Sequence, residues 1–468
     1  MALSSAAYLF CFLPIGTAAY FLIPNLRGKN IFLIIFGLIF YAFGQIEGVI
    51  LLLLSSAVNY AAGVLIARGW REKTVFIVAV VFDLLMLGVF KYFDFFVCVG
   101  AGLFGVKDFS AGLILPVGIS FFTFREISYV ADCRKNPQAA SRSFFDVLLY
   151  ISFFPQLTSG PIARFGDFER QLRERTHSAE RAARGLRRLI VGLAKKLLVA
   201  SLVGEIADAA FTAGALDFRL AWLGAAAYTL QIYFDFSGYS DMAIGLASVF
   251  GFDSPENFNY PYVSSSITEF WRRWHISLSS WFRDYVYIPL GGSRRGVNRT
   301  AANKAAVFLL CGLWHGASMT FVLWGAWHAA FSALESRFKY VDRLRSSKWG
   351  RGLSHVYALA AVCLGFVLFR ADTLAQAGTV YAALFTGFSL SAETTLALQR
   401  ITPTAWIAFA AGIAACTPLY PLAAKKLTNE RAREVLSVAS WPCSVLLLAL
   451  CMLALAGGGF QPFIYFQF

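Results

Sequence analysis

Apolar stretches about as long as a lipid bilayer is thick recur along most of this 468-residue sequence, separated by short loops rich in Lys and Arg. A helix needs about 17–25 apolar residues to cross the hydrocarbon layer. Hydrophobic residues make up 58% of the chain and charged residues 15%, so a water-soluble core could not cover this much apolar surface. The pattern predicts an all-α, polytopic integral membrane protein and argues against a soluble or a disordered chain.

Basic clusters follow every second apolar stretch in the first part of the chain, beginning with Arg27 and Lys29 after the first stretch. Because cytoplasmic loops collect Lys and Arg, these loops are expected on the cytoplasmic side of the membrane and both termini on the opposite side. The expected spans are Ala6–Ile23, Ile31–Phe43, Val49–Ala67, Val75–Val97 and Leu113–Val130 in the first third, and Leu353–Phe369, Ala405–Leu422 and Val435–Leu455 near the end.

Three further apolar segments depart from this simple alternation. Phe144–Gly160 has basic residues on both sides and ends in Pro and Gly, which predicts a re-entrant segment. Leu220–Phe250 is too long for one perpendicular span, and Ala305–Phe338 lies between two basic regions and predicts a hairpin or a pair of tilted half-spans. We expect one membrane domain over residues 1–468, built from about ten to thirteen crossing or re-entrant helices.

The charge balance is strongly basic, with 41 Lys and Arg against 27 Asp and Glu, a net charge of +14. Basic inner loops account for most of this excess, so no nucleic-acid partner is needed. Eight cysteines are scattered without a C-x-x-C pair, which predicts neither a disulfide framework nor a zinc site. We expect no bound metal.

Two carboxylates interrupt the long apolar segment Leu220–Phe250, at Asp235 and Asp241. Charges at membrane depth are costly and indicate function by default, or a hydrogen-bond network that fixes helix packing. Both readings remain open for these two residues.

A polar and aromatic segment, Ser266 to Tyr285, shows helical periodicity. Ser266 and Glu269 have the spacing of a capping box, and Trp271, Trp274, His275, Leu278 and Trp281 recur at helical steps. This predicts one amphipathic helix lying at a membrane interface, with His275 on its apolar side. Its arginines, Arg272, Arg273 and Arg283, are interfacial anchors or, beside a cavity, ligands for a phosphate-bearing substrate.

His315 lies in the middle of the apolar segment Ala305–Phe338, between Gly312 and Gly316. Imidazole is the side chain best able to exchange a proton near neutral pH. From the chemistry alone, a catalytic histidine and a buried, hydrogen-bonded structural histidine are equally favoured here. If this segment were one continuous helix, His315 and His328 would lie about 20 Å apart on roughly opposite faces and could not share one site.

Several of these motifs, in order and over nearly the whole chain, resemble the membrane-bound O-acyltransferase family, in particular its bacterial alginate and peptidoglycan O-acetyltransferase branch. The motifs that carry the resemblance are Phe154-Pro155-Gln156-Leu157, Tyr233-Phe234-Asp235-Phe236-Ser237-Gly238-Tyr239-Ser240-Asp241, Phe258-Asn259-Tyr260-Pro261-Tyr262, Phe270-Trp271-Arg272-Arg273-Trp274-His275, Tyr287-Ile288-Pro289-Leu290-Gly291-Gly292, Trp314-His315-Gly316-Ala317 and Phe463-Ile464-Tyr465-Phe466.

The resemblance implies a funnel-shaped helical fold in the bacterial inner membrane and transfer of an acetyl group from cytoplasmic acetyl-CoA to an exported polysaccharide, with an alginate-like polymer as the expected acceptor. It implies that His315 is the catalytic base or a transient acyl carrier and that His275 assists it. Donor binding or support is expected from Arg272, Arg273, Trp274, Asp235 and Asp241. His328 is followed by Ala329 where the branch often has Gly, which leaves its role open.

The expected partners are an extracytoplasmic acetyltransferase protein, the polysaccharide acceptor and membrane lipids, with no bound cofactor. Acetylation of peptidoglycan and D-alanyl transfer to teichoic acid are alternatives within the same chemistry. On physical grounds alone, a glycan or lipid transporter would also use intramembrane carboxylates and a re-entrant segment.

Overall fold

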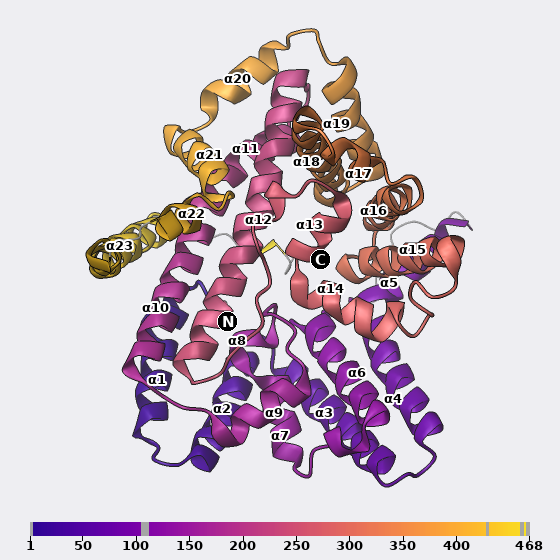
Figure 1. Cartoon of the computed structure of the whole chain (residues 1–468), viewed down its shortest axis with the longest axis vertical. Helices are drawn as coiled ribbons and strands as arrows, with labels where there is room; N and C mark the ends of the chain where they lie inside the picture. Colours follow the sequence, from indigo (N-terminus) through magenta and orange to yellow (C-terminus); the bar gives the residue numbers. More distant parts are fainter. Residues whose placement is uncertain (1–2, 104–111, 427–429, 459–462, 465–468) are drawn as a thin grey trace. The chain divides into compact units, whose positions relative to one another are not determined.

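The computed structural model describes residues 3–103, 112–426, 430–458 and 463–464, and every regular element in these ranges is a helix. This confirms the predicted all-α class (Figure 1). The chain divides into two compact units, one of residues 1–189 and 242–255 and one of residues 190–241 and 256–468. The prediction of a single domain over 1–468 remains a prediction.

The first unit consists of helices in its two sequence segments. Its elements are η1 (Tyr8–Phe12), α1 (Leu13–Leu22), α2 (Leu26–Ala42), α3 (Ile46–Ala67), α4 (Glu72–Leu87), η2 (Gly88–Tyr92), α5 (Phe93–Leu103), α6 (Ile119–Lys135), η3 (Pro137–Ala139), α7 (Phe144–Ser152), α8 (Phe154–Leu157), α9 (Phe165–Glu174) and most of α10 (Ala179–Ala194). Helices α3, α4 and α6 pack against one another (Figure 1).

The predicted re-entrant segment is a broken helix. Helix α7 has nine residues, about 14 Å, and is therefore shorter than the hydrocarbon layer. The chain leaves helical geometry at Phe153, directly before the short helix α8. Arg125 of α6 is fully buried and donates hydrogen bonds to the carbonyl oxygens of Tyr150, Ile151 and Gln156 around this break, which satisfies backbone groups that a broken helix would leave unpaired.

The second unit contains the remaining helices. They are η4 (Lys195–Ala200), α11 (Ser201–Phe211), α12 (Phe218–Val249), η5 (Pro261–Val263), α13 (Ile267–Arg273), α14 (Ile276–Phe282), η6 (Arg283–Tyr287), α15 (Gly296–His315), α16 (Met319–Phe338), α17 (Tyr340–Arg345), α18 (Lys348–Arg370), α19 (Leu374–Thr386), α20 (Ala392–Arg400), α21 (Pro403–Ala415), α22 (Leu419–Lys426) and α23 (Glu430–Ala456). The unit boundaries place the last residues of α12 in the first unit.

The predicted hairpin within Ala305–Phe338 is confirmed: α15 ends at His315 and α16 begins at Met319. The two helices pack closely because glycines face backbone at their contact. A Cβ atom at Gly312 would lie 2.3 Å from the carbonyl oxygen of Phe321, and one at Gly325 would lie 2.4 Å from that of Phe308. No larger residue fits at either position without moving a helix.

The prediction of one continuous amphipathic helix from Ser266 to Tyr285 is wrong. The structure has two short helices, α13 and α14, which are separated at Trp274 and His275. His275 adopts left-handed backbone geometry, with φ of 42°. Tertiary hydrogen bonds from His275 and Ser277 to Asn257 hold this break, and helical periodicity in a sequence carries no signal for such bonds.

Four described helical segments are long and apolar enough to cross a membrane, and α21 and α22 would form a fifth if that bent pair is one span. The four segments are Ile46–Ala67, Glu72–Cys98, Lys348–Arg370 and Val438–Ala456, which overlap four of the predicted spans. Leu220–Phe250 is largely one helix of 32 residues. The expected span Leu113–Val130 is placed wrongly, because α6 begins at Ile119 and continues to Lys135.

Candidate active site

His275 lies at the break between α13 and α14, and its side chain is fully buried. Its Nδ1 atom lies 3.1 Å from Oδ1 of Asn257, which also accepts hydrogen bonds from the backbone N–H and the hydroxyl of Ser277. Asn257 Nδ2 in turn donates to the hydroxyl of Ser240, on α12. Because this network makes Asn257 Oδ1 an acceptor, we assign the proton of His275 to Nδ1.

The second ring nitrogen of His275, Nε2, is buried and has no hydrogen-bond partner in the part of the chain that the structure describes. Burial lowers the pKa of His275 to about 3, so the imidazole is neutral near pH 7. A neutral ring with its proton on Nδ1 presents the lone pair of Nε2. His275 can therefore accept a hydrogen bond from a group that enters the site.

His315 is the last residue of α15 and is 3% exposed. Its ring is enclosed by aromatic side chains: the centroids of Trp324 and Phe369 each lie 5.1 Å from that of His315. The indole of Trp314 lies 4.9 Å from His315 and 6.1 Å from His275, measured between centroids. The structure therefore brings the two predicted catalytic histidines to one indole ring, although they are 40 positions apart in the sequence.

The third histidine of this region, His328, lies next to the same cluster. Its ring is 5.0 Å from Trp324, so His315 and His328 are neighbours of one indole. This follows from the hairpin, since a continuous helix would have separated them. Trp271 Nε1 donates to His328 Nδ1 over 3.3 Å, which links the Trp-Arg-Arg-Trp-His segment to α16. The sequence contained no signal for this bond.

Helix α13, which leads to His275, is anchored at its start by Glu335 of α16. The carboxylate accepts hydrogen bonds from the backbone N–H groups of Ile267 and Thr268 over 2.6 and 2.9 Å. N–H groups at a helix N-terminus have no partner within the helix, and a negative charge is stabilising there. Sequence reasoning missed Glu335, because the contact joins positions 67 and 68 residues apart.

The predicted capping pair at the same helix is partly confirmed. Ser266 Oγ accepts from the backbone N–H of Glu269 over 2.9 Å, but the Glu269 carboxylate accepts from the N–H of Ser265 and not from that of Ser266. Glu269 also forms ion pairs with Arg273 at 3.0 Å and Arg345 at 2.8 Å. Burial raises the pKa of Glu269, but hydrogen bonds from Ser265 and Arg273 outweigh it and hold the pKa below its usual range.

The two adjacent arginines expected at a donor site differ in their surroundings. Arg273 is held by Glu269 and also donates to the carbonyl oxygen of Asn259. Arg272 is exposed and forms no ion pair with any described residue, and its charge repels that of Lys304 on α15. Of the two guanidinium groups, that of Arg272 is the one available to an anionic ligand.

Asp235 and Asp241 of α12 pair with consecutive lysines of η4. Asp235 Oδ1 lies 2.6 Å from Lys196 Nζ, and Asp241 Oδ2 lies 2.6 Å from Lys195 Nζ. The other oxygen of Asp235 accepts from the backbone N–H of Ile464 over 2.8 Å. These contacts favour the packing role over donor binding. In the C-terminal motif, Tyr465 and Phe466 lie outside the described residues.

Trp274 is buried and packs against several aromatic rings. Its ring lies 5.1 Å from Phe258, 5.3 Å from Phe366, 5.4 Å from Phe270 and 6.3 Å from Tyr262. These contacts support a positioning role for Trp274, because they hold in place the residue that directly precedes His275.

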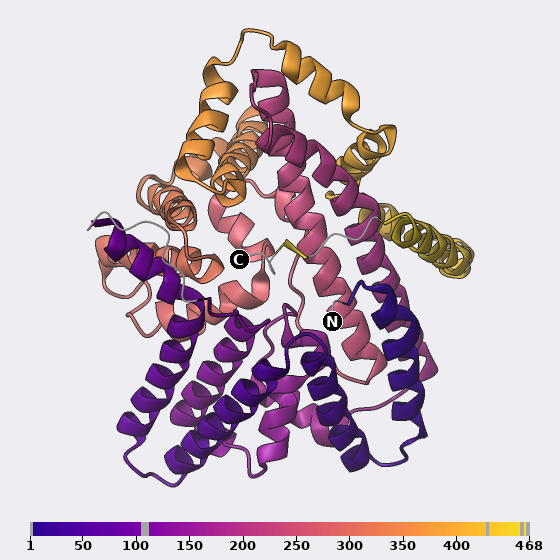
Figure 2. The same cartoon turned by 180° about the vertical axis from the view of Figure 1, so that it is seen from behind.

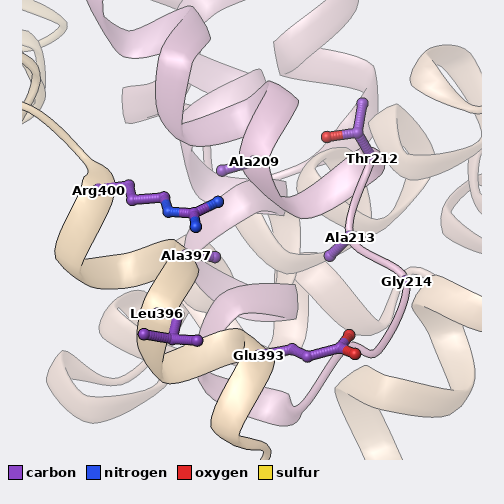
Figure 3. Close-up of a pocket in the computed structure, with 8 residues that line it drawn as sticks. All are labelled: Ala209, Thr212, Ala213, Gly214, Glu393, Leu396, Ala397 and Arg400. Atoms are coloured by element: carbon purple, nitrogen blue, oxygen red, sulfur yellow. The ribbon is translucent and has the colours of Figure 1, made fainter.

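A separate cleft of about 470 Å³ lies on the second unit between the end of α11 and helix α20 (Figure 3). Its lining includes one carboxylate and one guanidinium group but no histidine. Its lining consists of Ala209, Thr212, Ala213, Gly214, Glu393, Leu396, Ala397 and Arg400. This cleft therefore contains neither of the two histidines predicted from the sequence to be catalytic.

Residues 35–370 match the membrane-bound O-acyltransferase family. The chain belongs to this family. It is 39% identical to a probable alginate O-acetylase of Azotobacter vinelandii over the full length of both chains. It is 42% identical to a probable alginate O-acetylase of Pseudomonas aeruginosa, over 82% of this chain and 75% of the relative. A peptidoglycan O-acetyltransferase of Helicobacter pylori is 33% identical over 79% and 77% of the two chains.

As a member of the membrane-bound O-acyltransferase family, the protein is an O-acyltransferase of the membrane, which confirms the predicted class of enzyme. The matched range contains both His275 and His315 and ends at Arg370, the last residue of α18. Every residue of the site described above lies in the second unit. In the described part of the chain, no three His, Cys, Asp or Glu side chains converge on a metal position.

Proposed function

We propose that this protein transfers an acetyl group from cytoplasmic acetyl-CoA to hydroxyl groups of an exported, alginate-like polysaccharide. Two observations support the proposal: the rings of His315 and His275 both contact the indole of Trp314, and the chain resembles a probable alginate O-acetylase over its full length. The shared contact of the two histidines with Trp314 is the observation that carries the proposed chemistry, since O-acyl transfer needs one base and one group to orient the acceptor.

His315 acts as the base in this proposal. Its imidazole takes the proton of the attacking hydroxyl while the hydroxyl oxygen bonds to the acetyl carbonyl carbon. The intermediate then expels the sulfur of coenzyme A, which receives the proton from the imidazolium. His275 Nε2 accepts a hydrogen bond from the acceptor and orients it. In the alternative route, His315 carries the acetyl group itself before the hydroxyl attacks.

The proposed location is the bacterial inner membrane, with basic loops in the cytoplasm and both termini outside. The distribution of Lys and Arg between the apolar segments supports this orientation. The acceptor polymer lies on the other side of the membrane from the coenzyme, so we propose that an extracytoplasmic acetyltransferase protein receives or delivers the acetyl group.

The proposed donor carries phosphate groups, and we propose that the exposed guanidinium group of Arg272 binds one of them. Replacing Arg272 by Ala should raise the KM for acetyl-CoA about 5- to 10-fold with little change in kcat, because one charge-assisted hydrogen bond is lost. Initial rates over a range of acetyl-CoA concentrations measure both constants.

Two matched variants test whether position matters more than charge. Arg27→Ala removes one exposed basic charge from the start of α2 and should leave KM unchanged. Arg273→Ala breaks the ion pair with Glu269 and should lower stability more than donor affinity. An unchanged KM for acetyl-CoA in Arg272→Ala would contradict donor binding and leave Arg272 as an interfacial anchor.

Transfer of labelled acetyl is the direct test of the proposed function. Inverted membrane vesicles that contain the protein are supplied with acetyl-CoA labelled in the acetyl group, and polymer from the vesicle lumen is analysed for ester-linked label. Label on a uronate polymer supports the proposal, whereas label on peptidoglycan or on no polymer contradicts its acceptor. Passage of intact acetyl-CoA or glycan without ester formation would indicate a transporter.

A further inference from the structure

Four polar side chains form a buried cluster between α3, α4 and α6, in the first unit and outside the histidine site. Ser55 and Asn59 lie on α3, Asp83 lies on α4 and Glu126 lies on α6. All four residues are 0% exposed. The three helices pack side by side (Figure 2), so the cluster is enclosed by the helices themselves.

Hydrogen bonds join the four side chains in two pairs. Ser55 Oγ donates to Glu126 Oε1 over 2.6 Å, and Asn59 Nδ2 donates to Asp83 Oδ1 over 2.8 Å. Three further oxygens of these side chains, Asp83 Oδ2, Glu126 Oε2 and Asn59 Oδ1, are buried and have no hydrogen-bond partner among the described residues. Buried polar atoms are nearly always paired, so three unpaired oxygens in one cluster require an explanation.

The two buried carboxylates of the cluster also require an explanation. Neither Asp83 nor Glu126 forms an ion pair in the described part of the chain, although the two carboxylates interact electrostatically with each other. Arg125, the neighbour of Glu126 in the sequence, directs its guanidinium group to carbonyl oxygens around the break after α7. The phenol of Tyr41, on α2, also interacts electrostatically with Glu126 but supplies no positive charge.

We propose that Asp83, Glu126 and Asn59 form a binding site for one monovalent cation that the two carboxylates share. Two like charges in one dry site repel strongly unless a positive charge lies between them. The atoms available to bind a cation are all oxygens, which suit a hard cation and not a soft metal. A sodium ion and a proton both supply the required single positive charge.

The site has a structural consequence for the rest of the first unit. It joins α3 and α4, which both belong to membrane-spanning segments, to α6. The same helix α6 carries Arg125, which binds the carbonyl oxygens around the broken helix α7–α8. Cation binding therefore stabilises the helix that holds the re-entrant segment in place.

Thermal unfolding of the purified full-length protein in detergent tests the site and its occupant. Unfolding is measured in sodium chloride and in choline chloride at equal ionic strength, from acidic to alkaline pH. A sodium site predicts a Tm about 2–4 °C higher in sodium than in choline. A proton site predicts, in choline, a Tm that falls as the pH rises and the shared proton is lost, with no effect of sodium.

Variants assign the effect to these two residues. The double variant Asp83→Asn with Glu126→Gln keeps the side-chain shapes but removes both charges, so the dependence on sodium or pH should disappear. If the double variant does not accumulate, each single variant should show at least half of the loss. Asp167→Asn, at an exposed carboxylate paired with Arg170, should behave like the wild type. Identical dependence on sodium and pH in the wild type and the charge-free variants would overturn the proposal.

Discussion

Replacing His315 by Ala should reduce acetyl transfer by about 10²- to 10⁴-fold while the protein still inserts and folds, because the proposed general base is removed. The ring is 3% exposed and lies among Trp314, Trp324 and Phe369, so the substitution leaves a small cavity beside aromatic rings. The rate of ester formation from labelled acetyl-CoA measures the effect, and the elution profile in detergent reports folding.

A control histidine separates a loss of chemistry from a general loss of imidazole. His355 is exposed on α18, and its Nδ1 atom lies 3.2 Å from the carbonyl oxygen of Ser264. His355→Ala should keep most of the activity. Normal transfer by a well-folded His315→Ala protein would contradict the proposed role of His315.

The same variant distinguishes the two routes through His315. If the imidazole carries the acetyl group, wild-type protein incubated with labelled acetyl-CoA and no acceptor should retain label on the peptide that contains His315. If it acts only as a base, free imidazole should restore part of the activity of His315→Ala, and no label should remain on the wild-type peptide.

The sequence predicted the two histidines but not what holds them. His275 and His315 each lie in a recognisable motif, and Gly312 and Gly316 beside His315 indicated close helix packing. The groups that orient the site, Asn257 for His275 and Glu335 for α13, are distant in the sequence. Local patterns carry no information on such tertiary bonds, and for that reason the break at His275 was predicted as continuous helix.

Hydropathy reasoning also missed the charged residues of α6. Arg125 and Glu126 are adjacent and both 0% exposed. They are only two residues of a segment in which most of the other residues are apolar. Averaging over Leu113–Val130 therefore predicts a plain span. Their partners, the carbonyl oxygens around α7–α8 and the cluster with Ser55, become visible only once the helices are packed.

Removing Lys196 should destabilise the protein by about 3–5 kcal/mol, because the charge of Asp235 would be left buried without a partner. The side chains of Lys196 and Asp235 are 2% and 4% exposed, and their Nζ and Oδ1 atoms lie 2.6 Å apart. Helix α12 approaches α10 and η4 closely, which makes this pair possible: a Cβ atom at Gly238 would lie 2.7 Å from the carbonyl oxygen of Gly192. Lys196→Met therefore removes a charge that no water can replace.

A second substitution should reverse most of this loss. In the double variant Lys196→Met with Asp235→Asn, no charge is buried, and the amide oxygen of Asn can still accept from the backbone N–H of Ile464, as Asp235 does. Unfolding in mixed micelles measures the free energy of each variant. The neighbouring pair Lys195–Asp241 is more exposed, at 26% and 15%, so Lys195→Met should cost only about 1 kcal/mol. A double variant no more stable than Lys196→Met would show that the lysine stabilises the fold by packing and not by neutralising Asp235.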